Sequence, residues 1–294
     1  MDTSTVIGAC GTVLLWTGCT APPAINGWSV GEPTVVAGLS APECCLFDPA
    51  SCNVFVSNIV AAEGDNPYWS DDGAGHLSLL GADGVVHQEK WLAGDAENVI
   101  HAPKGMCLLG NRLWMADNTR LVSVRYGDGT DLRVISPPGA VHLNDMASDG
   151  THVYVSDTTT GKVLRIAEDG RTETVANIEA VNGLTIHDGT MFAVSWGLHE
   201  IYEVDLSGQR EPRPFGLAEH FTTLDGIEVL KDGTFLVTDF EGGRICTVSA
   251  DRKTVETLAL MPTPADLGVS RSNSMIYVPS LKTDVVHVFP LIAR

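Results

Sequence analysis

Residues 224–248 read LDGIEVLKDGTFLVTDFEGGRICTV, and this stretch decides the fold. An apolar run over Ile227–Leu230 leads into a Lys-Asp-Gly turn, and a second run over Thr234–Thr238 leads into a Gly-Gly turn. A third run begins at Arg244. Glycine-bearing turns between short β-branched and aromatic runs are typical of hairpins. The stretch therefore predicts a small antiparallel meander.

The same phrase occurs six times along the chain. Besides the copy that starts near Asp225, the others are NGLTIHDGTMFAVSW from Asn182, NDMASDGTHVYVSD from Asn144, KGMCLLGNRLWMAD from Lys104, DLGVSRSNSMIYVPS from Asp266 and ECCLFDPASCNVFVSN from Glu43. Successive copies are 61, 40, 38, 43 and 41 residues apart. A period near forty with about four short strands per unit is typical of β-propellers. We predict an all-β, six-bladed β-propeller of four-stranded antiparallel blades.

The two ends of the chain predict how the ring closes. The fifth unit has a fourth strand over Thr254–Leu260, whereas the sixth has room for only three strands before the chain ends. An extended segment at Pro33–Ala37, ahead of the first copy, is available to supply the missing strand. Such an N-terminal strand would complete the last blade and pair its open edge.

Length and composition favour one domain. The chain has 294 residues with 30 glycines, 15 prolines and 44% hydrophobic residues, and little of it reads as helix. We expect residues 31–294 to form the propeller and residues 1–30 to be an N-terminal tail or the remnant of an export signal. The apolar run Val6–Cys19 resembles a lipoprotein signal but lacks the basic leading segment, and it is too short to span a bilayer. Localisation is left open between cytoplasmic and exported or periplasmic.

The charge balance restricts the partners. The formal net charge is −19, and no Lys or Arg precedes Lys90, so a nucleic acid backbone would be repelled. The seven cysteines include no Cys-x-x-Cys pair, and four of them fall in expected strands as small apolar residues. We expect a small-molecule substrate, no nucleic acid and no transmembrane segment. The sequence does not indicate the oligomeric state.

Polar residues recur where each blade would face the channel. Each first strand should begin, and each second strand should end, at the same mouth of the ring. The positions that open the first strands are Glu43, Lys104, Asn144, Asn182, Asp225 and Asp266, and those that close the second strands are Asn58, Asp117, Asp157, Trp196, Asp239 and Ser280. The alternative is that Asp117, Asp157 and Asp239 are turn caps and that Trp196 is an apolar wall of the mouth.

Several carboxylates at one narrow mouth need compensation. Burying them unpaired is costly unless a cation, or a base such as Lys104, neutralises them. Carboxylate and amide oxygens favour a hard divalent ion, calcium first, with magnesium, manganese or zinc as the other choices. Lys104 can serve either as a catalytic group or as a structural counter-ion to Glu43 or Asp145.

The ordered series Glu43, Asn144-Asp145, Asn182-Gly183-Leu184 and Asp225-Gly226-Ile227 resembles the senescence marker protein/gluconolactonase family of six-bladed propellers. The resemblance covers about residues 40 to 290. It implies a divalent metal held by Glu43, Asn182 and Asp225, and a substrate contact at Asn144. In sugar lactonases of this family an arginine lies two residues before the matching asparagine, whereas this chain has His142.

A mechanism for these residues follows. A metal at the three ligands would act as Lewis acid and lower the pKa of a bound water. Asp225 or Asp145 would take the proton, and Lys104 or Asn144 would stabilise the oxyanion. This set predicts a metal-dependent lactonase or esterase-type hydrolase.

Further residues are expected to contact the substrate, and other functions stay open. An insertion in the first unit, Val60–Ala74, has the polar, Gly/Pro/Asp-rich composition of a surface loop and carries two aromatic residues. The expected substrate contacts are His142, Asn144, Lys104, Trp196, Tyr68 and Trp69. The alternatives are a non-hydrolytic propeller enzyme of lyase, isomerase or synthase type, and a non-catalytic ligand-binding propeller.

Overall fold

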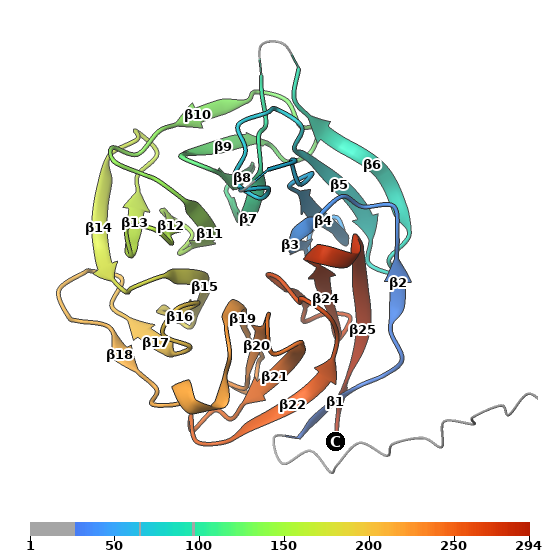
Figure 1. The fold of residues 1–294 in the computed structure, drawn as a ribbon, viewed down its shortest axis with the longest axis vertical. Coiled ribbons are helices and arrows are strands. Elements are labelled where there is room, and N and C mark those ends of the chain that lie inside the picture. The colour runs from blue at the N-terminus through green and yellow to red at the C-terminus, as the bar shows by residue number, and fades with distance from the viewer. Residues whose placement is uncertain (1–26, 65, 96–97) are drawn as a thin grey trace, which may run out of the picture.

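The computed structural model describes residues 27–64, 66–95 and 98–294. These residues form 25 strands and two short 3-10 turns, η1 (Ala218–His220) and η2 (Leu281–Thr283), with no α-helix among them. Figure 1 shows six sheets arranged around a central axis, each with its first strand innermost. The prediction of an all-β, six-bladed propeller of antiparallel blades is confirmed.

Five blades follow the chain in order, and their pairing is antiparallel throughout. Blade 1 contains β3 (Pro42–Asp48), β4 (Asn53–Asn58), β5 (His76–Gly81) and β6 (Val86–Ala93); blade 2 contains β7 (Pro103–Leu109), β8 (Arg112–Asp117), β9 (Arg120–Arg125) and β10 (Arg133–Ile135). Blade 3 contains β11 (Leu143–Ser148), β12 (Val153–Asp157), β13 (Lys162–Ile166) and β14 (Thr172–Asn177). Blade 4 contains β15 (Val181–His187), β16 (Thr190–Ser195), β17 (Ile201–Val204) and β18 (Arg213–Pro214); blade 5 contains β19 (Leu224–Val229), β20 (Phe235–Asp239), β21 (Arg244–Val248) and β22 (Val255–Leu260).

Blade 6 joins the two ends of the described chain. Its C-terminal strands are β23 (Gly268–Ser270), β24 (Met275–Ser280) and β25 (Val285–Ala293). The N-terminal β2 (Thr34–Val36) pairs with β25, which confirms the predicted closure. A second N-terminal strand, β1 (Trp28–Val30), also pairs with β25. The propeller sheet thus begins three residues before the expected boundary at residue 31, and the expected signal-like run Val6–Cys19 lies outside the described residues.

Apolar side chains fill the space between neighbouring blades. Between blades 4 and 5, for example, the rings of Phe192 and Phe235 meet edge to face with centroids 4.9 Å apart. The five cysteines that the structure describes have free thiols, and four of them are buried in strands: Cys44, Cys45, Cys107 and Cys246. They act as small apolar residues, as the sequence predicted.

A β-bulge opens the first strand of five blades at the same place. In blade 1 the register shifts between Pro42 and Cys45, and the same shift occurs in β7, β11, β15 and β19. The two residues inside each shift include the polar residue that the sequence placed at the channel. A bulge re-aims side chains and frees a backbone N–H from the ladder. In blades 1, 3 and 5 a hydroxyl of the second strand accepts that N–H, as when Cys44 N donates to Ser57 Oγ at 2.9 Å.

Glycine follows the polar residue where the inner strands approach most closely. A Cβ atom at Gly183 would lie 2.3 Å from the backbone oxygen of Asp225, and one at Gly226 would lie 2.7 Å from the Cα of Asp266. Real Cβ atoms do not make such contacts, so only glycine permits this spacing. The close packing brings the polar residues of successive blades together at the axis.

The acidic residues that close the second strands hold loops, not the channel mouth. Asp117 accepts hydrogen bonds from the backbone N–H groups of His101 and Ala102 and forms an ion pair with Arg120 at 2.8 Å. Asp157 and Asp239 accept backbone N–H groups of their own loops in the same way. The expectation that the second set rings the mouth was wrong for these aspartates, for which the turn-cap alternative holds, whereas Trp196 of the same set lines the cavity at the axis. A buried carboxylate is stable here because several donors surround it.

Two neighbouring valines of β2, the strand that closes the ring, allow a prediction about stability together with its control. Val36 of β2 is buried against Tyr277, Val286 and Val288, whereas its neighbour Val35 is 54% exposed. We expect Val36→Asp to lower the free energy of unfolding by about 3 kcal/mol, because the charge would be buried without a partner. Val35→Asp should change it by less than about 0.5 kcal/mol. Urea unfolding measures both, and equal effects would contradict the role of β2.

Candidate active site at the propeller axis

One cavity of about 380 Å³ lies at the axis, where the first strands open. Its lining comes from the first strands of five blades, from the loop between β4 and β5, and from residues that follow the second strands, including Leu281 and Lys282 of blade 6. The lining residues are Glu43, Ile59, Tyr68, Trp69, Lys104, Asn144, Thr158, Asn182, Trp196, Asp225, Phe240, Glu241, Leu281 and Lys282.

Three buried oxygen atoms of this cavity stand out. Glu43 Oε2, Asn182 Oδ1 and Asp225 Oδ1 accept no hydrogen bond from any residue that the structure describes. The three residues are 4–6% exposed and come from the bulges of β3, β15 and β19. An unsatisfied buried oxygen is costly, and three in one cavity indicate a missing donor or cation. These are the three residues that the family resemblance implies as metal ligands.

The electrostatics of the cavity point the same way. Burial raises the pKa of Glu43 well above its ordinary value, and the neighbouring Asp225 raises it further. The pKa of Asp225 is raised to about 8 by burial and by Asp145. Burial lowers the pKa of Lys104 to about 8, although Glu43 and Asp225 oppose that shift. A second positive charge would therefore stabilise the ionised carboxylates.

Lys104 fixes the loop that covers the cavity. Its Nζ donates to the backbone oxygen of Tyr68 at 2.6 Å and to that of Ala102 at 3.2 Å. The same Nζ lies 3.8 Å from the centre of the Trp69 ring, a cation–π contact. These contacts favour the structural alternative for Lys104, which balances the charge of the carboxylates and anchors the loop. If Lys104 acts in catalysis, only the third N–H of its ammonium group is free to contact a substrate.

The insertion between β4 and β5 is held at both sides of Trp69. Asn118 Nδ2 donates to Ser70 O at 2.9 Å and to Asp71 Oδ1 at 2.7 Å. The His142 ring stacks on Trp69 with centroids 4.1 Å apart. The expected surface loop is thus packed over the cavity and places Tyr68 and Trp69 in its wall.

Two predicted site residues are not among those that line the cavity. His142 donates its backbone N–H to Asp157, and its Nδ1 lies 2.7 Å from Thr159 Oγ1. Its ring stacks on Trp69, which does line the cavity, and the substrate contact expected at His142 stays a prediction. Asp145 accepts the N–H of Met146 at 2.6 Å on one oxygen and that of Leu184 at 2.5 Å on the other.

Asp145 is therefore a connector between blades, because both its oxygens are occupied by backbone N–H groups of blades 3 and 4. The hypothesis that it acts as general base is not supported by this geometry. Asp266 also lies outside the lining, and its backbone pairs with Glu43 and Cys45 of blade 1. Asn144 does face the cavity and donates to Thr158 Oγ1 at 3.3 Å.

The register of the second strands explains which residues form the upper wall. In blade 4 the strand end is Ser195, and Trp196 is the next residue. The equivalent next residues in blades 1, 3, 5 and 6 are Ile59, Thr158, Phe240 and Leu281, and all of them line the cavity, whereas Asn118 of blade 2 does not. Sequence reasoning assigned Trp196 to the strand end and did not find Ile59, Thr158 and Leu281. A signal was present for two of them, because Ile59 follows the pair Ser57-Asn58 and Thr158 follows the pair Ser156-Asp157.

The donor set fits a hard divalent cation. The described residues contain no cluster of three or more His, Cys, Asp or Glu arranged to hold a metal. An ion here would therefore need the amide oxygen of Asn182 beside the two carboxylates, with water completing the shell. Amide and carboxylate oxygens suit calcium, magnesium or manganese, whereas zinc prefers nitrogen and sulfur ligands.

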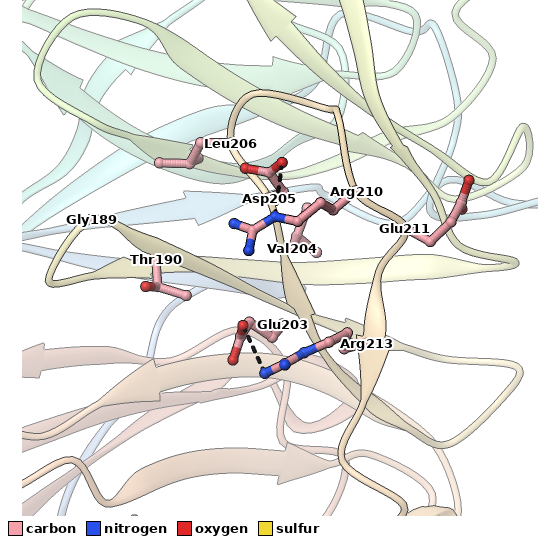
Figure 2. A pocket seen from close by; sticks show the side chains of 9 residues that line it. All are labelled: Gly189, Thr190, Glu203, Val204, Asp205, Leu206, Arg210, Glu211 and Arg213. Carbon is pink, nitrogen blue, oxygen red and sulfur yellow. Dashed lines mark hydrogen bonds and ion pairs between the residues drawn. The ribbon is translucent and has the colours of Figure 1, made fainter.

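A second hollow lies on blade 4, away from the axis (Figure 2), and encloses about 120 Å³. Its charged side chains neutralise one another, as Arg210 pairs with Asp205 at 3.3 Å and Arg213 pairs with Glu203 at 3.0 Å. Paired surface charges of this kind offer little to a ligand. The axial cavity is the better candidate site.

Comparison with known proteins finds likeness in structure only. No family model matches the sequence. No curated protein matches it either. Among solved structures, a proposed gluconolactonase shares 19% identity over 93% of this chain and 97% of its own, with a TM-score of 0.69.

Two further solved structures are enzymes by name. A luciferin-regenerating enzyme shares 14% identity over 89% of this chain and 96% of its own, with a TM-score of 0.66. A virginiamycin B lyase from Staphylococcus aureus, in complex with quinupristin, shares 13% identity over 90% of this chain and all of its own, with a TM-score of 0.62. Identities this low establish the architecture and leave the chemistry to be argued from the site.

The expected resemblance is thus confirmed at the level of the fold: the chain is a six-bladed β-propeller with the architecture of the gluconolactonase-like and luciferin-regenerating propellers.

Proposed function

We propose that this protein is a metal-dependent hydrolase that opens a lactone or a related ester. The observation that carries the proposal is that three buried oxygens in one cavity, those of Glu43, Asn182 and Asp225, have no hydrogen-bond partner in the described part of the chain. These residues would hold the ion, with calcium the first choice. A bound divalent ion supplies Lewis acidity toward a carbonyl oxygen and lowers the pKa of a coordinated water.

Asp225 is the proposed general base. Its Oδ1 is unpartnered in the cavity, whereas both oxygens of Asp145 are occupied by backbone N–H groups. A carboxylate with one oxygen directed at the ligand site can use the other to take a proton from the attacking water. The assignment distinguishes two neighbouring aspartates by their hydrogen bonds.

Asn144 is the proposed donor to the oxyanion. Its Nδ2 has two N–H bonds, and Thr158 Oγ1 is its one acceptor among the residues that the structure describes. The second N–H is available to a carbonyl oxygen that becomes negatively charged during attack. Lys104 contributes positive charge at the cavity wall and keeps the covering loop in place.

Proton release from a panel of γ-lactones, δ-lactones and aryl esters tests the proposal directly. Hydrolysis produces a carboxylic acid, so each turnover releases a proton at neutral pH. We expect activity with calcium and at least a hundred-fold lower rates after removal of the metal with EDTA. Calcium binding without hydrolysis of any ester would refute the hydrolase and favour a non-hydrolytic enzyme, a type represented among the structural neighbours by the virginiamycin B lyase.

A further inference from the structure

The upper wall of the axial cavity is apolar, in contrast to its floor. The floor carries the oxygen-bearing side chains of the first strands. The wall is formed by Ile59, Tyr68, Trp69, Trp196, Phe240 and Leu281. Four of these six are aromatic, although aromatic residues make up only 6% of the chain. This concentration of rings is a property of the site and not of the composition.

The wall is built into the fold. Trp196 and Phe240, from blades 4 and 5, lie with ring centroids 5.1 Å apart and an interplanar angle of 51°. Phe240 and Leu281 belong to a buried apolar cluster that Tyr68 and Trp196 also contact. Side chains held on both sides by neighbours offer a preformed surface to a ligand.

Polar groups on the wall are few or already engaged. Glu241 and Lys282 form an ion pair at 3.5 Å, and Lys282 Nζ lies 5.1 Å from the centre of the Phe240 ring. Thr158 already accepts a hydrogen bond from Asn144. A ring that carries several hydroxyl groups would lose more hydrogen bonds to water on this wall than the Tyr68 hydroxyl and the two indole N–H groups can replace. An apolar ring would lose none and would gain contact with the aromatic faces.

Charge restricts the ligand further. The chain as a whole has a net charge of −19, and the charged side chains that line the cavity are Glu43, Asp225 and Glu241, with Lys104 and Lys282 as partial compensation. A substrate that is itself anionic would be repelled on approach. The acid produced by hydrolysis would be repelled in the same way, which favours its release.

From this wall and this charge we infer that the substrate is an uncharged lactone or ester whose acyl or leaving group contains an apolar ring. The inference rests on the proposed hydrolase function for the reaction, and on the wall alone for the kind of ligand. The carbonyl end would meet the oxygen-bearing floor, and the ring would lie between Trp196, Phe240 and Trp69. Hydrolysis adds water across the acyl C–O bond, giving a carboxylate, a hydroxyl group and one released proton.

The test compares two δ-lactones that differ in polarity, 3,4-dihydrocoumarin and glucono-δ-lactone, in the presence of calcium. We expect kcat/KM for dihydrocoumarin to exceed that for gluconolactone by at least a hundred-fold. Trp196→Ala and Phe240→Ala should each raise the KM for dihydrocoumarin about ten-fold or more, with kcat nearly unchanged. Leu260→Ala is the control, because Leu260 is 79% exposed on β22. Equal or better hydrolysis of gluconolactone would overturn the inference.

A binding measurement separates this inference from the reaction. The uncharged ketone 1-tetralone has a dihydrocoumarin-like shape and cannot be hydrolysed. We expect it to quench tryptophan fluorescence and to bind at least ten-fold more weakly to Trp196→Ala. If tetralone binds in this way while no lactone is opened, the wall is assigned correctly and the hydrolase is refuted. If tetralone does not bind, or binds Trp196→Ala equally well, the inference on the ligand is wrong whatever the enzyme does.

Discussion

Asp225→Asn lowers kcat for lactone hydrolysis by about a thousand-fold if the account is correct, while the protein stays folded. The substitution keeps the shape of the side chain and removes the group that both binds the ion and takes the proton. General-base catalysis alone contributes roughly a hundred- to ten-thousand-fold, so the loss should be severe. Initial rates at saturating lactone with calcium present measure the effect.

The control for this variant lies in the same cavity. Glu241→Gln also removes one negative charge, but Glu241 lies at the rim, where it pairs with Lys282. We expect its kcat to stay within about three-fold of the unmodified protein, because surface pairs of this kind contribute little. Full activity of Asp225→Asn, or equal losses in the two variants, would show that Asp225 has no special role.

The second large effect concerns stability and calcium. A ligand that binds only the folded state at a hundred times its Kd stabilises that state by about 2.7 kcal/mol. For a chain of this size the increase corresponds to a rise in Tm of roughly 5 °C. We expect calcium to raise the Tm by about this amount over EDTA, as measured by circular dichroism.

Variants of the proposed metal ligands should change the Tm in EDTA and the response of the Tm to calcium in opposite directions. Glu43→Gln and Asp225→Asn each remove one buried carboxylate from the cavity, where burial disfavours the ionised form of both and Asp225 further raises the pKa of Glu43. We therefore expect each variant to melt at a higher temperature than the unmodified protein in EDTA. Neither should respond to calcium. If calcium still raised the Tm of both variants, the ion would have to bind at another site.

The repeat made the architecture predictable from the sequence. Six copies of one hairpin sequence motif at a nearly constant spacing leave few ways to arrange the sheets other than in a ring. The short sixth copy also showed where the closing strand must come from. The extra strand β1 (Trp28–Val30) was not predicted, because a run of three residues is too short to show an alternation of its own.

The sequence predicted where along each strand the site residues lie, but not the direction in which their side chains point. Five of the six residues expected to open the first strands line the cavity, and Asp266 does not. The bulges that aim the five into the cavity were not predicted, since a bulge depends on register. One residue of register separates Asp225, which faces the cavity, from Gly226, which packs against blade 6. The same uncertainty misplaced Asp145, which occupies the position equivalent to Gly226 in blade 3.

The serine or threonine before the end of the second strand is the signal that could have located the bulges. Ser57, Ser156 and Thr238 each accept the N–H that a bulge leaves without a ladder partner. Their position next to an asparagine or aspartate gives a short Ser/Thr-Asn/Asp pair. The roles of His142 and Lys104, in contrast, depend on the loop between β4 and β5. Contacts between segments so distant in sequence cannot be inferred from spacing.

The position of a divalent ion in crystals tests the central claim most directly. Crystals grown with manganese in place of calcium, and measured for anomalous scattering, locate the ion without reference to activity. The account predicts one strong peak at the axis, within about 2.6 Å of Glu43 Oε2, Asn182 Oδ1 and Asp225 Oδ1. A cavity without a peak at saturating metal, or a peak that these three oxygens do not contact, would contradict it.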